Sequence, residues 1–419
     1  SKPVGRRAEA LEGPLGEAHD PAALRARLAE GPAPDAVCIT HNETSTGAIQ
    51  PLAELAAAVR DAAPDALLLV DVVTSLAGAE LRFALSEHAV MGVVGVLRQL
   101  PLLVRAFASY LRLLRDDPPD LVVLVDYPGL HVVMAKAARR LGIPVLHYIA
   151  PQYWAWGPWR MRRYRRAVDG TLTILPFETE FFRRHRVPAL YIGHPLLDEL
   201  AEHPPAPAAV GRVRERRTLV LLPGSRRAEI EANLPGMLRI AAGIRSADAD
   251  CRVVLAHRNP RRTALLRALL DTAGADFVEH HEGPLAPWLA GARLVLAKSG
   301  TGSLEACLHR APTVVVYRLR GLLASLGYHN ILSVPFIAGA NLVAGRAVVP
   351  EHCFHGDGGW RRVAADAEKL WADDDARRVC RAGLDEVRER LGAPGATGRV
   401  AAVVARFLDS EPATSERTP

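Results

Sequence analysis

Short apolar runs rich in β-branched residues recur along the chain, each bounded by turn-forming residues. Such runs are typical of strands that are buried on both faces of a parallel sheet. They predict strands at residues 36–40, 66–70, 121–125, 144–149, 172–175, 218–222, 252–256, 294–297 and 313–316. Helical patterns rich in Ala, Leu, Arg and Glu lie between most of them, as at 52–61 and 131–141. The alternation predicts an α/β fold.

A proline-rich stretch divides this pattern into two halves. Residues 203–217 begin with HPPAPAAV and continue as a charged run, and such proline density is typical of a linker. Each half is then predicted to form a Rossmann-like domain. We expect the two domains to face a cleft, the usual place for a nucleotide and its substrate.

Composition agrees with a globular, two-domain protein. The chain has 419 residues, of which 49% are hydrophobic and 23% charged, and no stretch reaches the roughly eighteen uninterrupted apolar residues that a membrane span requires. The five cysteines are scattered without any CxxC spacing, which favours reduced thiols in the cytoplasm and argues against a metal site. The net charge of +6 is carried almost wholly by arginine.

A first candidate for phosphate binding is the turn in TLVLLPGSR, residues 218–226. Here a strand leads through Gly224 and Ser225 into the start of a helix. Such a turn points backbone N–H groups and the positive helix end at an anion, and Arg226 can add a bidentate grip on phosphate. The alternative is an ordinary strand-to-helix turn with a solvated arginine.

A second turn of this kind follows the strand at 294–297, in KSGTGSLE, residues 298–305. Its glycines, Gly300 among them, permit close approach of the backbone, and Ser299 and Thr301 supply hydroxyl groups. Glu305 is predicted in the first helical turn, where its carboxylate can accept both hydroxyls of a ribose or merely complement the helix dipole. Two such turns in one half predict a nucleotide diphosphate site. Neither matches a Walker A loop or GxGxxG.

The third candidate is a segment rich in tryptophan and arginine, IAPQYWAWGPWRMRRYRR at residues 149–166. Aromatic and cationic side chains together suit a surface of anionic lipid headgroups. Nucleic acid is a rival partner, and a packed loop followed by a solvated basic helix is the structural alternative. The candidate contacts for acceptor and membrane are Gln152, Trp154, Trp156, Arg160, Arg162 and Arg163.

These motifs together resemble one family, lipid-A-disaccharide synthase. The resemblance rests on VDYPG (125–129), GIP (142–144), PQxWAW (151–156), ILPFE (174–178), GHP (193–195), LPGSR (222–226), SGT (299–301) with Glu305, and NLxAGR (341–346). Order and spacing match from about residue 81 to the C-terminal helices. The resemblance implies a GT-B fold and transfer of 2,3-diacylglucosamine from UDP to 2,3-diacylglucosamine 1-phosphate, called lipid X.

The resemblance also implies roles and partners. Arg226, Ser225 and the turn 299–301 would hold the UDP pyrophosphate, Glu305 would bind the ribose, and Asn341 would lie at the donor site. The partners would be UDP-2,3-diacylglucosamine, lipid X and the inner-membrane surface, where the protein would attach peripherally; no cofactor, metal or nucleic acid is expected. Helix ends and Arg226 would neutralise the leaving diphosphate.

One departure concerns the catalytic base. Many members of the family carry an Asp directly after the proline of VDYPG, where it is proposed as the base, and this chain has Gly129 there. Another carboxylate would have to deprotonate the attacking hydroxyl, and Asp126 is the nearest candidate by sequence. A capping or structural role for Asp126 is the alternative.

The second departure is the N-terminal segment. Residues 1–83 lack the family's first strand and acceptor-site turn, and instead resemble a fragment of a class V pyridoxal-phosphate aminotransferase in THNETSTG (40–47) and LLVDVVTSLAG (68–78). The resemblance implies that Thr44 contacts the cofactor ring oxygen and Asp71 its pyridinium nitrogen. No lysine lies between Lys2 and Lys136 to form the Schiff base, so we predict no transaminase activity.

Two readings of function remain open at this point. The chain is an active disaccharide synthase, or it is a fused chain that binds UDP without turnover. The predicted organisation is an aminotransferase-like strand–helix–strand segment (1–83), the rest of the acceptor domain (84–202), a donor domain (203–385), a C-terminal helix (386–408) and a tail (409–419). The oligomeric state is left open.

Overall fold

The computed structural model describes residues 21–29, 36–40, 67–71, 93–319 and 334–409. These residues form two compact units. The first contains α1 (Pro21–Ala29), β1 (Ala36–Thr40) and β2 (Leu67–Asp71), and β1 pairs with β2 in parallel, with Ala36 opposite Leu67. The two strands predicted here are confirmed within one residue. The predicted helix at 52–61 and Thr44 lie outside the described residues.

The second unit contains a four-stranded parallel sheet in the order β3-β4-β5-β6. Its elements are the part of α3 (Val93–Asp116) that follows Ala106, β3 (Val122–Val125), α4 (Pro128–Arg140), β4 (Val145–Tyr148), α5 (Tyr153–Trp156), α6 (Met161–Tyr164), β5 (Gly170–Thr173), α7 (Pro176–Arg184) and β6 (Ala189–Tyr191). The helices bury Leu114, Tyr164 and Phe182 against Val122 and Val145.

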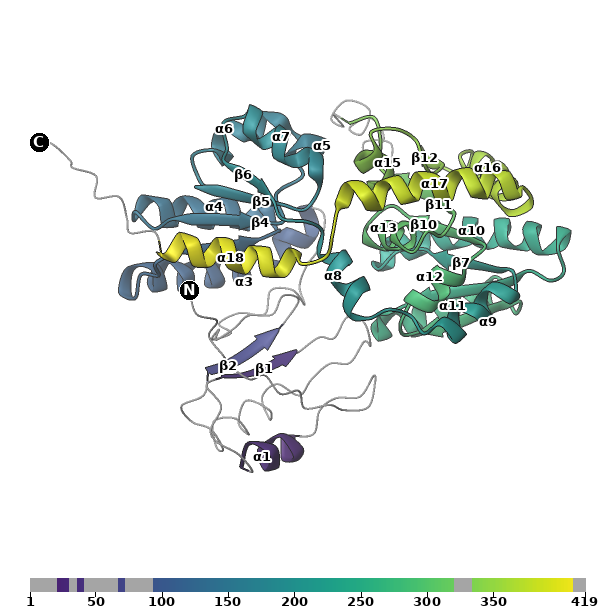
Figure 1. Cartoon of the computed structure of the whole chain (residues 1–419), viewed down its shortest axis with the longest axis horizontal. Coiled ribbons are helices and arrows are strands. Elements are labelled where there is room, and N and C mark those ends of the chain that lie inside the picture. Colours follow the sequence, from purple (N-terminus) through teal and green to yellow (C-terminus); the bar gives the residue numbers. More distant parts are fainter. Residues whose placement is uncertain (1–20, 30–35, 41–66, 72–92, 320–333, 410–419) are drawn as a thin grey trace, which may run out of the picture. The chain divides into compact units, whose positions relative to one another are not determined.

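The same unit contains a six-stranded sheet in the order β9-β8-β7-β10-β11-β12 (Figure 1). Its strands are β7 (Thr218–Leu222), β8 (Arg252–His257), β9 (Val278–Glu282), β10 (Leu294–Lys298), β11 (Thr313–Leu319) and β12 (Glu351–His355). Its helices are α10 (Arg227–Ala247), α11 (Thr263–Thr272), α12 (Ala286–Gly291), α13 (Thr301–Leu308), α15 (Gly339–Ala344) and α16 (Trp360–Ala372). The chain reverses its direction across the sheet between β7 and β10, which creates a topological switch point.

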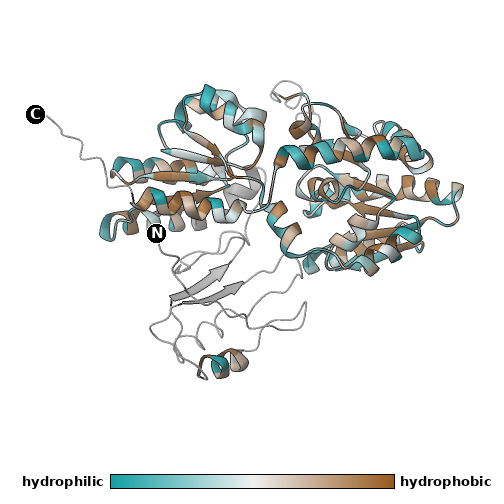
Figure 2. Cartoon of the chain, viewed as in Figure 1, coloured by the Kyte–Doolittle hydropathy of each residue, from teal (hydrophilic) through white to brown (hydrophobic). Residues whose placement is uncertain are grey.

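Burial explains which strands the sequence predicted. All five residues of β7 are buried, as are four of the five in β10, so both strands read as continuous apolar runs and appear brown in Figure 2. The strands β6, β9 and β12 were not predicted. β6 has only three residues, and VEHHE in β9 and EHCFH in β12 are too polar to give that signal.

The predicted linker is mostly helical. After α8 (Pro195–Glu202), the helix α9 (Pro207–Glu215) takes up the charged run, and only residues 203–206 connect the two. Pro207 occupies the first helical position, where its missing N–H costs no hydrogen bond. The expectation of an irregular linker is therefore wrong from Pro207 onward, and the domain boundary at 203–217 stays a prediction.

The C-terminal region contains two helices rather than the predicted single helix at 386–408. These are α17 (Asp374–Leu391) and α18 (Ala396–Asp409), separated by Gly392, which has a φ of 78° that only glycine adopts freely. Ala396 of α18 packs against Tyr148 and Ile192 of the four-stranded sheet's core. Among the described residues, no helix is both long enough and apolar enough to span a membrane.

Candidate functional site

The turn from β7 into α10 has the predicted strand–turn–helix geometry. Gly224 has a φ of 122°, and a Cβ there would lie 2.8 Å from the Oε2 atom of Glu229. Arg226 occupies the N-cap position of α10. Only glycine therefore lets the backbone close around the Glu229 carboxylate.

The Glu229 carboxylate lies where this turn was predicted to hold a phosphate. Its Oε2 accepts the backbone N–H groups of Ser225 and Arg226, each at 3.3 Å, and its Oε1 accepts from the Arg226 guanidinium at 3.0 Å. The pKa of Glu229 is below its ordinary value, because Lys298 and Arg226 outweigh the effect of burial. A carboxylate thus fills the place where a phosphate was predicted, and as the N3 residue of α10 it accepts the N–H of the N-cap residue Arg226.

The turns after β7 and β10 lie side by side at the switch point. The two strands are neighbours in the sheet, and the Nζ of Lys298, the last residue of β10, lies 3.0 Å from the Oε1 of Glu229. Lys298 also lies 5.5 Å from the centroid of the Tyr317 ring. The sequence motifs included Lys298, in KSGTGSLE, without assigning it a role, and they did not include Glu229. The sequence could have pointed to Lys298, because it is a lysine at the end of a predicted strand in a chain that has only four lysines.

The second turn keeps its backbone donors available. Gly300 is the N-cap of α13 with a φ of 153°, and the N–H groups of Thr301 and Gly302 have no acceptor within the described part of the chain. The Oγ of Ser299 donates to the Ile337 carbonyl at 2.9 Å. Thr301 is exposed, so its hydroxyl faces solvent. The turn can therefore offer two N–H groups and one hydroxyl to an anion.

Glu305 does not lie in the first turn of α13, as predicted, but in the second. The helix begins at Thr301, and no acidic residue falls in its first turn. The Glu305 side chain is buried, with 3% of its surface exposed. The prediction placed the helix start too late because TGSLE contains a second glycine, which was read as part of the turn.

Asn341 is fully occupied by contacts within the protein. Its Oδ1 accepts the N–H groups of Val348 and Val349 at 2.7 and 3.0 Å, and its Nδ2 donates to the Val349 carbonyl and to Glu351 at 3.0 and 2.9 Å. Both donors and both lone pairs of the amide are therefore used. These contacts give Asn341 the role of joining α15 to the start of β12, and its place at the donor site stays what the resemblance implies.

Asp126 lies at the carboxyl end of β3 in a strained backbone conformation. Asp126 and Tyr127 both have positive φ values, 53° and 42°, which costs about 1–2 kcal/mol per residue. The Asp126 carbonyl accepts from His131 Nδ1 at 2.8 Å and from His147 Nε2 at 3.0 Å. A carbonyl only accepts, so both ring nitrogens carry protons. The Asp126 carboxylate itself is exposed.

Burial favours the neutral form of the two histidines around Asp126. Burial lowers the pKa of His147 to about 4 and also lowers the pKa of His131, although the bond to the Asp126 carbonyl opposes the shift in both. Each therefore uses its single N–H to hold the Asp126 carbonyl. Next to this turn, a Cβ at Gly129 would meet no heavy atom within 4 Å, so the position has room for a larger side chain.

The tryptophan- and arginine-rich segment separates into a buried and an exposed part. Trp154 is buried, donates from Nε1 to Glu178 at 3.0 Å and packs edge-on against Phe177. The predicted lipid contact of Trp154 is therefore wrong: the ring belongs to the core because the buried Glu178 accepts its N–H. Gln152 is exposed at the N-cap of α5.

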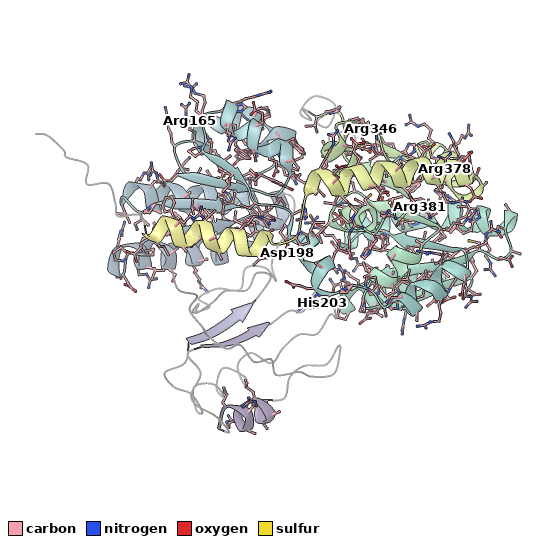
Figure 3. All side chains as sticks on the ribbon, in the orientation of Figure 1. Arg165, Asp198, His203, Arg346, Arg378 and Arg381 are labelled. Carbon is pink, nitrogen blue, oxygen red and sulfur yellow. The ribbon has the colours of Figure 1, made fainter. Side chains whose placement is uncertain are left out.

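The residues after Gly157 form an exposed basic face. Trp159 is 62% exposed, and it lines a hollow of about 460 Å³ together with Arg160, Arg162, Arg163 and Arg166. Arg165 extends outward from the same stretch (Figure 3). The side chain of Trp156 lies outside the described residues. The structure thus groups the three predicted arginines with Trp159, which the prediction omitted.

The comparison with protein families shows which family the chain belongs to. Residues 41–377 match the model of the family described as lipid-A-disaccharide synthetase. The chain belongs to the lipid-A-disaccharide synthase family. Relatives include the synthases of Geobacter sulfurreducens (34% identical, covering 80% of this chain and 87% of the relative) and Myxococcus xanthus (35% identical, covering 85% and 94%). Membership makes the chain a glycosyltransferase of lipid A disaccharide synthesis.

Solved structures share the fold at low sequence identity. The UDP-GlcNAc 2-epimerase of Neisseria meningitidis bound to UDP-GlcNAc gives a TM-score of 0.52 at 14% identity, covering 92% of this chain and 95% of that one. The Staphylococcus aureus MnaA–UDP structure gives 0.53 at 13% identity, covering 82% and 89%. The synthase thus has the predicted α/β fold of GT-B type.

The family match also bears on the N-terminal segment. It begins at residue 41 and so includes part of the segment 1–83 that the sequence analysis compared with an aminotransferase. The aminotransferase resemblance stays a prediction.

Glu178, which holds Trp154, gives the synthase a pH-dependent stability. Burial raises the pKa of Glu178 to about 7, against the effect of the N–H groups of Leu175, Trp154 and Ile174 that it accepts. The folded state therefore keeps a proton that the unfolded state loses near pH 4.5. Since the unfolded state then binds fewer protons, the free energy of unfolding should fall by roughly 2–3 kcal/mol between pH 4.5 and 7.

Glu178→Gln should remove this fall, while lowering stability at all pH values because an amide cannot accept all three N–H groups. Urea unfolding at pH 5 and pH 7.5 measures the slope. Glu180→Gln, on an exposed side chain of the same helix, is the matched control and should keep it. If the free energy of unfolding of Glu178→Gln falls with pH as steeply as that of wild type, Glu178 is not the cause of the fall.

Proposed function

We propose that this synthase transfers 2,3-diacylglucosamine from its UDP conjugate to the 6-hydroxyl of lipid X, and releases UDP. The observation that carries the proposal is the pair of anion-binding turns at the β7–β10 switch point, joined by Lys298 and Glu229 at 3.0 Å. A nucleotide diphosphate suits such a place because helix ends and backbone N–H groups there favour negative charge.

On the donor side, the diphosphate takes over the position of the Glu229 carboxylate. The N–H groups of Ser225 and Arg226, with the Arg226 guanidinium and Lys298, then hold one phosphate, while Thr301 and its neighbouring N–H groups hold the other. These positive groups stabilise the UDP oxyanion as the sugar–phosphate bond breaks. Glu305 binds the ribose, and Asn341 positions the adjoining backbone.

On the acceptor side, the Asp126 carboxylate accepts the proton of the attacking hydroxyl. The hydroxyl oxygen forms the new glycosidic bond as the bond to UDP breaks, so the electron pair ends on the leaving diphosphate. The histidines that fix the Asp126 carbonyl keep this carboxylate in place.

The basic face around Trp159 supports attachment to a membrane. Its arginines, Arg160, Arg162 and Arg163 among them, attract anionic headgroups, and an exposed tryptophan is suited to the interface. We propose that the protein attaches peripherally to the inner membrane, where both lipid substrates reside. We also propose that Gln152 lies near the acceptor. Residues 1–83 stand in for the first unit of the acceptor domain and have no transaminase activity.

Arg226→Ala should weaken UDP binding by about 1.5–3 kcal/mol, because a charged hydrogen-bond donor to phosphate is lost. Isothermal titration with UDP measures the change. Arg227→Ala is the matched control: its guanidinium pairs with Glu231 and is largely exposed, so its affinity for UDP should stay unchanged. Equal affinity in Arg226→Ala and wild type would refute the placement of the diphosphate.

The proposed reaction is tested by incubating purified protein with UDP-2,3-diacylglucosamine and lipid X, with UDP affinity measured on the same sample. Formation of the disaccharide 1-phosphate supports the proposal. Tight UDP binding without product supports the alternative, a chain with an intact donor half and a broken acceptor half. No UDP binding would contradict both.

A further inference from the structure

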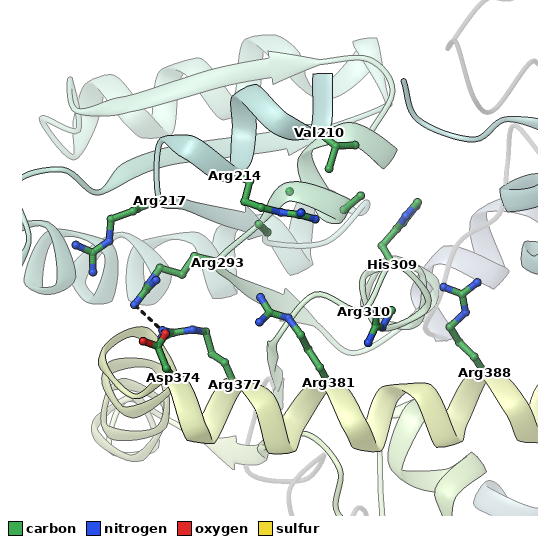
Figure 4. A pocket seen from close by; sticks show the side chains of 13 residues that line it. Val210, Arg214, Arg217, Arg293, His309, Arg310, Asp374, Arg377, Arg381 and Arg388 are labelled. Atoms are coloured by element: carbon green, nitrogen blue, oxygen red, sulfur yellow. Dashed lines mark ion pairs between the residues drawn. The ribbon is translucent and has the colours of Figure 1, made fainter. Parts of the chain in front are cut away.

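A second cationic site lies at the amino-terminal edge of the six-stranded sheet, the edge opposite the two turns. Arg217 directly precedes β7 and Arg293 directly precedes β10. Together with residues of α9 and α17 they line a cavity of about 580 Å³ (Figure 4). Seven of the thirteen lining residues are arginines, and one, Asp374, is acidic. The donor site makes no use of this cavity.

Part of this charge is compensated. Arg217 pairs with Asp248 at 3.0 Å, Arg310 pairs with Asp385, and Arg377 pairs with Asp374. Asp374 also lies 3.9 Å from Arg293. Within the described part of the chain, three carboxylates therefore face seven arginines, and the cavity keeps a surplus of positive charge.

Two of the arginines, Arg377 and Arg293, are held in place by hydrogen bonds to backbone carbonyls. Arg377 is 2% exposed and donates to the carbonyls of Leu370 and Trp371 at the end of α16. Arg293 donates to the same Trp371 carbonyl at 2.9 Å, and its guanidinium lies 5.4 Å from the Trp371 ring centroid. Burial, followed by the nearby Arg293, lowers the pKa of Arg377 to about 10. These two arginines therefore serve the fold as well as the cavity's charge.

Arg214 of α9 and Arg381 of α17 differ from Arg293 and Arg377 in their contacts. Their guanidinium groups enter the cavity from helices on opposite sides (Figure 4), and within the described residues neither pairs with a carboxylate. Burial, followed by the positive charge of Arg214, lowers the pKa of Arg381. Two like charges that face one another across a cavity destabilise the empty protein, and an anion between them would remove this cost.

We propose that this cavity binds a small anion carrying one or more phosphate groups, held between Arg214 and Arg381. Guanidinium groups bind phosphate oxygens in a bidentate way, and the volume exceeds what an inorganic diphosphate needs. The source of the phosphate is a soluble metabolite or a lipid headgroup. The proposal does not depend on the glycosyl transfer proposed above.

The test is calorimetric titration of inorganic pyrophosphate into the full chain at saturating UDP and constant ionic strength. UDP fills the turns at the other edge of the sheet; should UDP not bind, the Arg226→Ala background replaces it. Wild type is expected to bind pyrophosphate, and Arg381→Gln or Arg214→Gln should weaken the binding at least tenfold. Arg378→Gln, one turn earlier on α17, 74% exposed and paired with Asp375, should bind like wild type.

A second measurement separates a binding role from a structural one. Without ligand, Arg381→Gln should melt at a higher temperature than wild type, because the repulsion from Arg214 is relieved. With pyrophosphate, the melting temperature of wild type should rise and that of Arg381→Gln should not. A lower melting temperature of the empty variant would contradict the proposed clash of charges.

Vesicles of phosphatidylglycerol identify the source of the phosphate. In a background with Arg160, Arg162 and Arg163 changed to Gln, which removes the basic face around Trp159, cosedimentation that Arg381→Gln loses and Arg378→Gln keeps, without pyrophosphate binding, assigns the site to a lipid headgroup. Pyrophosphate binding that depends on Arg381 assigns it to a soluble phosphate. Absence of both, or equal loss in Arg378→Gln, overturns the proposal.

Discussion

Replacement of Asp126 by Asn is expected to lower the turnover of UDP-2,3-diacylglucosamine and lipid X by about 10²- to 10⁴-fold, the usual contribution of a general base. The amide has the same shape but cannot take up the proton of the attacking hydroxyl. UDP affinity should stay unchanged, since Asp126 follows β3 and the donor turns follow β7 and β10. Steady-state rates with UDP titration on the same variant measure both quantities.

Two further variants decide whether Asp126 is the base. Gly129→Asp introduces the carboxylate that many family members carry, at a position with open space for a side chain and in the first turn of α4, where an acidic residue is favourable. It should restore turnover to Asp126→Asn. His131→Gln removes the ring that holds the Asp126 carbonyl. If His131→Gln abolishes turnover while Asp126→Asn retains it, His131 and not Asp126 is the base.

Asp198→Ala is expected to lower the free energy of unfolding by about 2–4 kcal/mol. Its carboxylate accepts the backbone N–H groups of Gly395, Ala396 and Thr397 at 2.6, 3.0 and 2.9 Å, and the Thr397 hydroxyl at 3.0 Å. It therefore caps α18, whose apolar face completes the core at Tyr148 and Ile192. Loss of the cap removes the acceptor of all four donors, of which the Ala396 N–H belongs to a buried residue. Denaturant unfolding measures the change.

The effect of Asp198→Ala should depend on pH. Burial alone would raise the pKa of Asp198, but the donated hydrogen bonds outweigh it and hold the pKa below its ordinary value. The contribution to stability is therefore present above the unfolded-state pKa of about 4 and is lost as the pH falls through the lower folded-state pKa. Glu202→Ala, exposed on the same helix, should show no such loss. A difference between wild type and Asp198→Ala that does not shrink at all as the pH falls below 4 would disprove the capping role.

The tertiary structure gives neighbouring residues of one motif different surroundings. Trp154 and Arg160 belong to one aromatic and basic stretch, yet Trp154 faces the core because Glu178 accepts its N–H. The family resemblance implies that Asn341 lies at the donor site, and in the structure its amide joins two backbone segments. Periodicity and composition do not report which polar group finds a partner inside the protein, since that partner comes from a distant part of the chain.

By itself, the sequence determined the α/β fold, the positions of the buried strands to within three residues at either end, and the two turns after β7 and β10. These features depend on local signals, namely apolar runs bounded by glycine and proline. Only the tertiary structure brought the two turns together at a switch point, through strand order. It alone placed Glu229 and Lys298 between them, and gathered arginines from α9 and α17 around one cavity, because such contacts depend on long-range packing that local sequence does not encode.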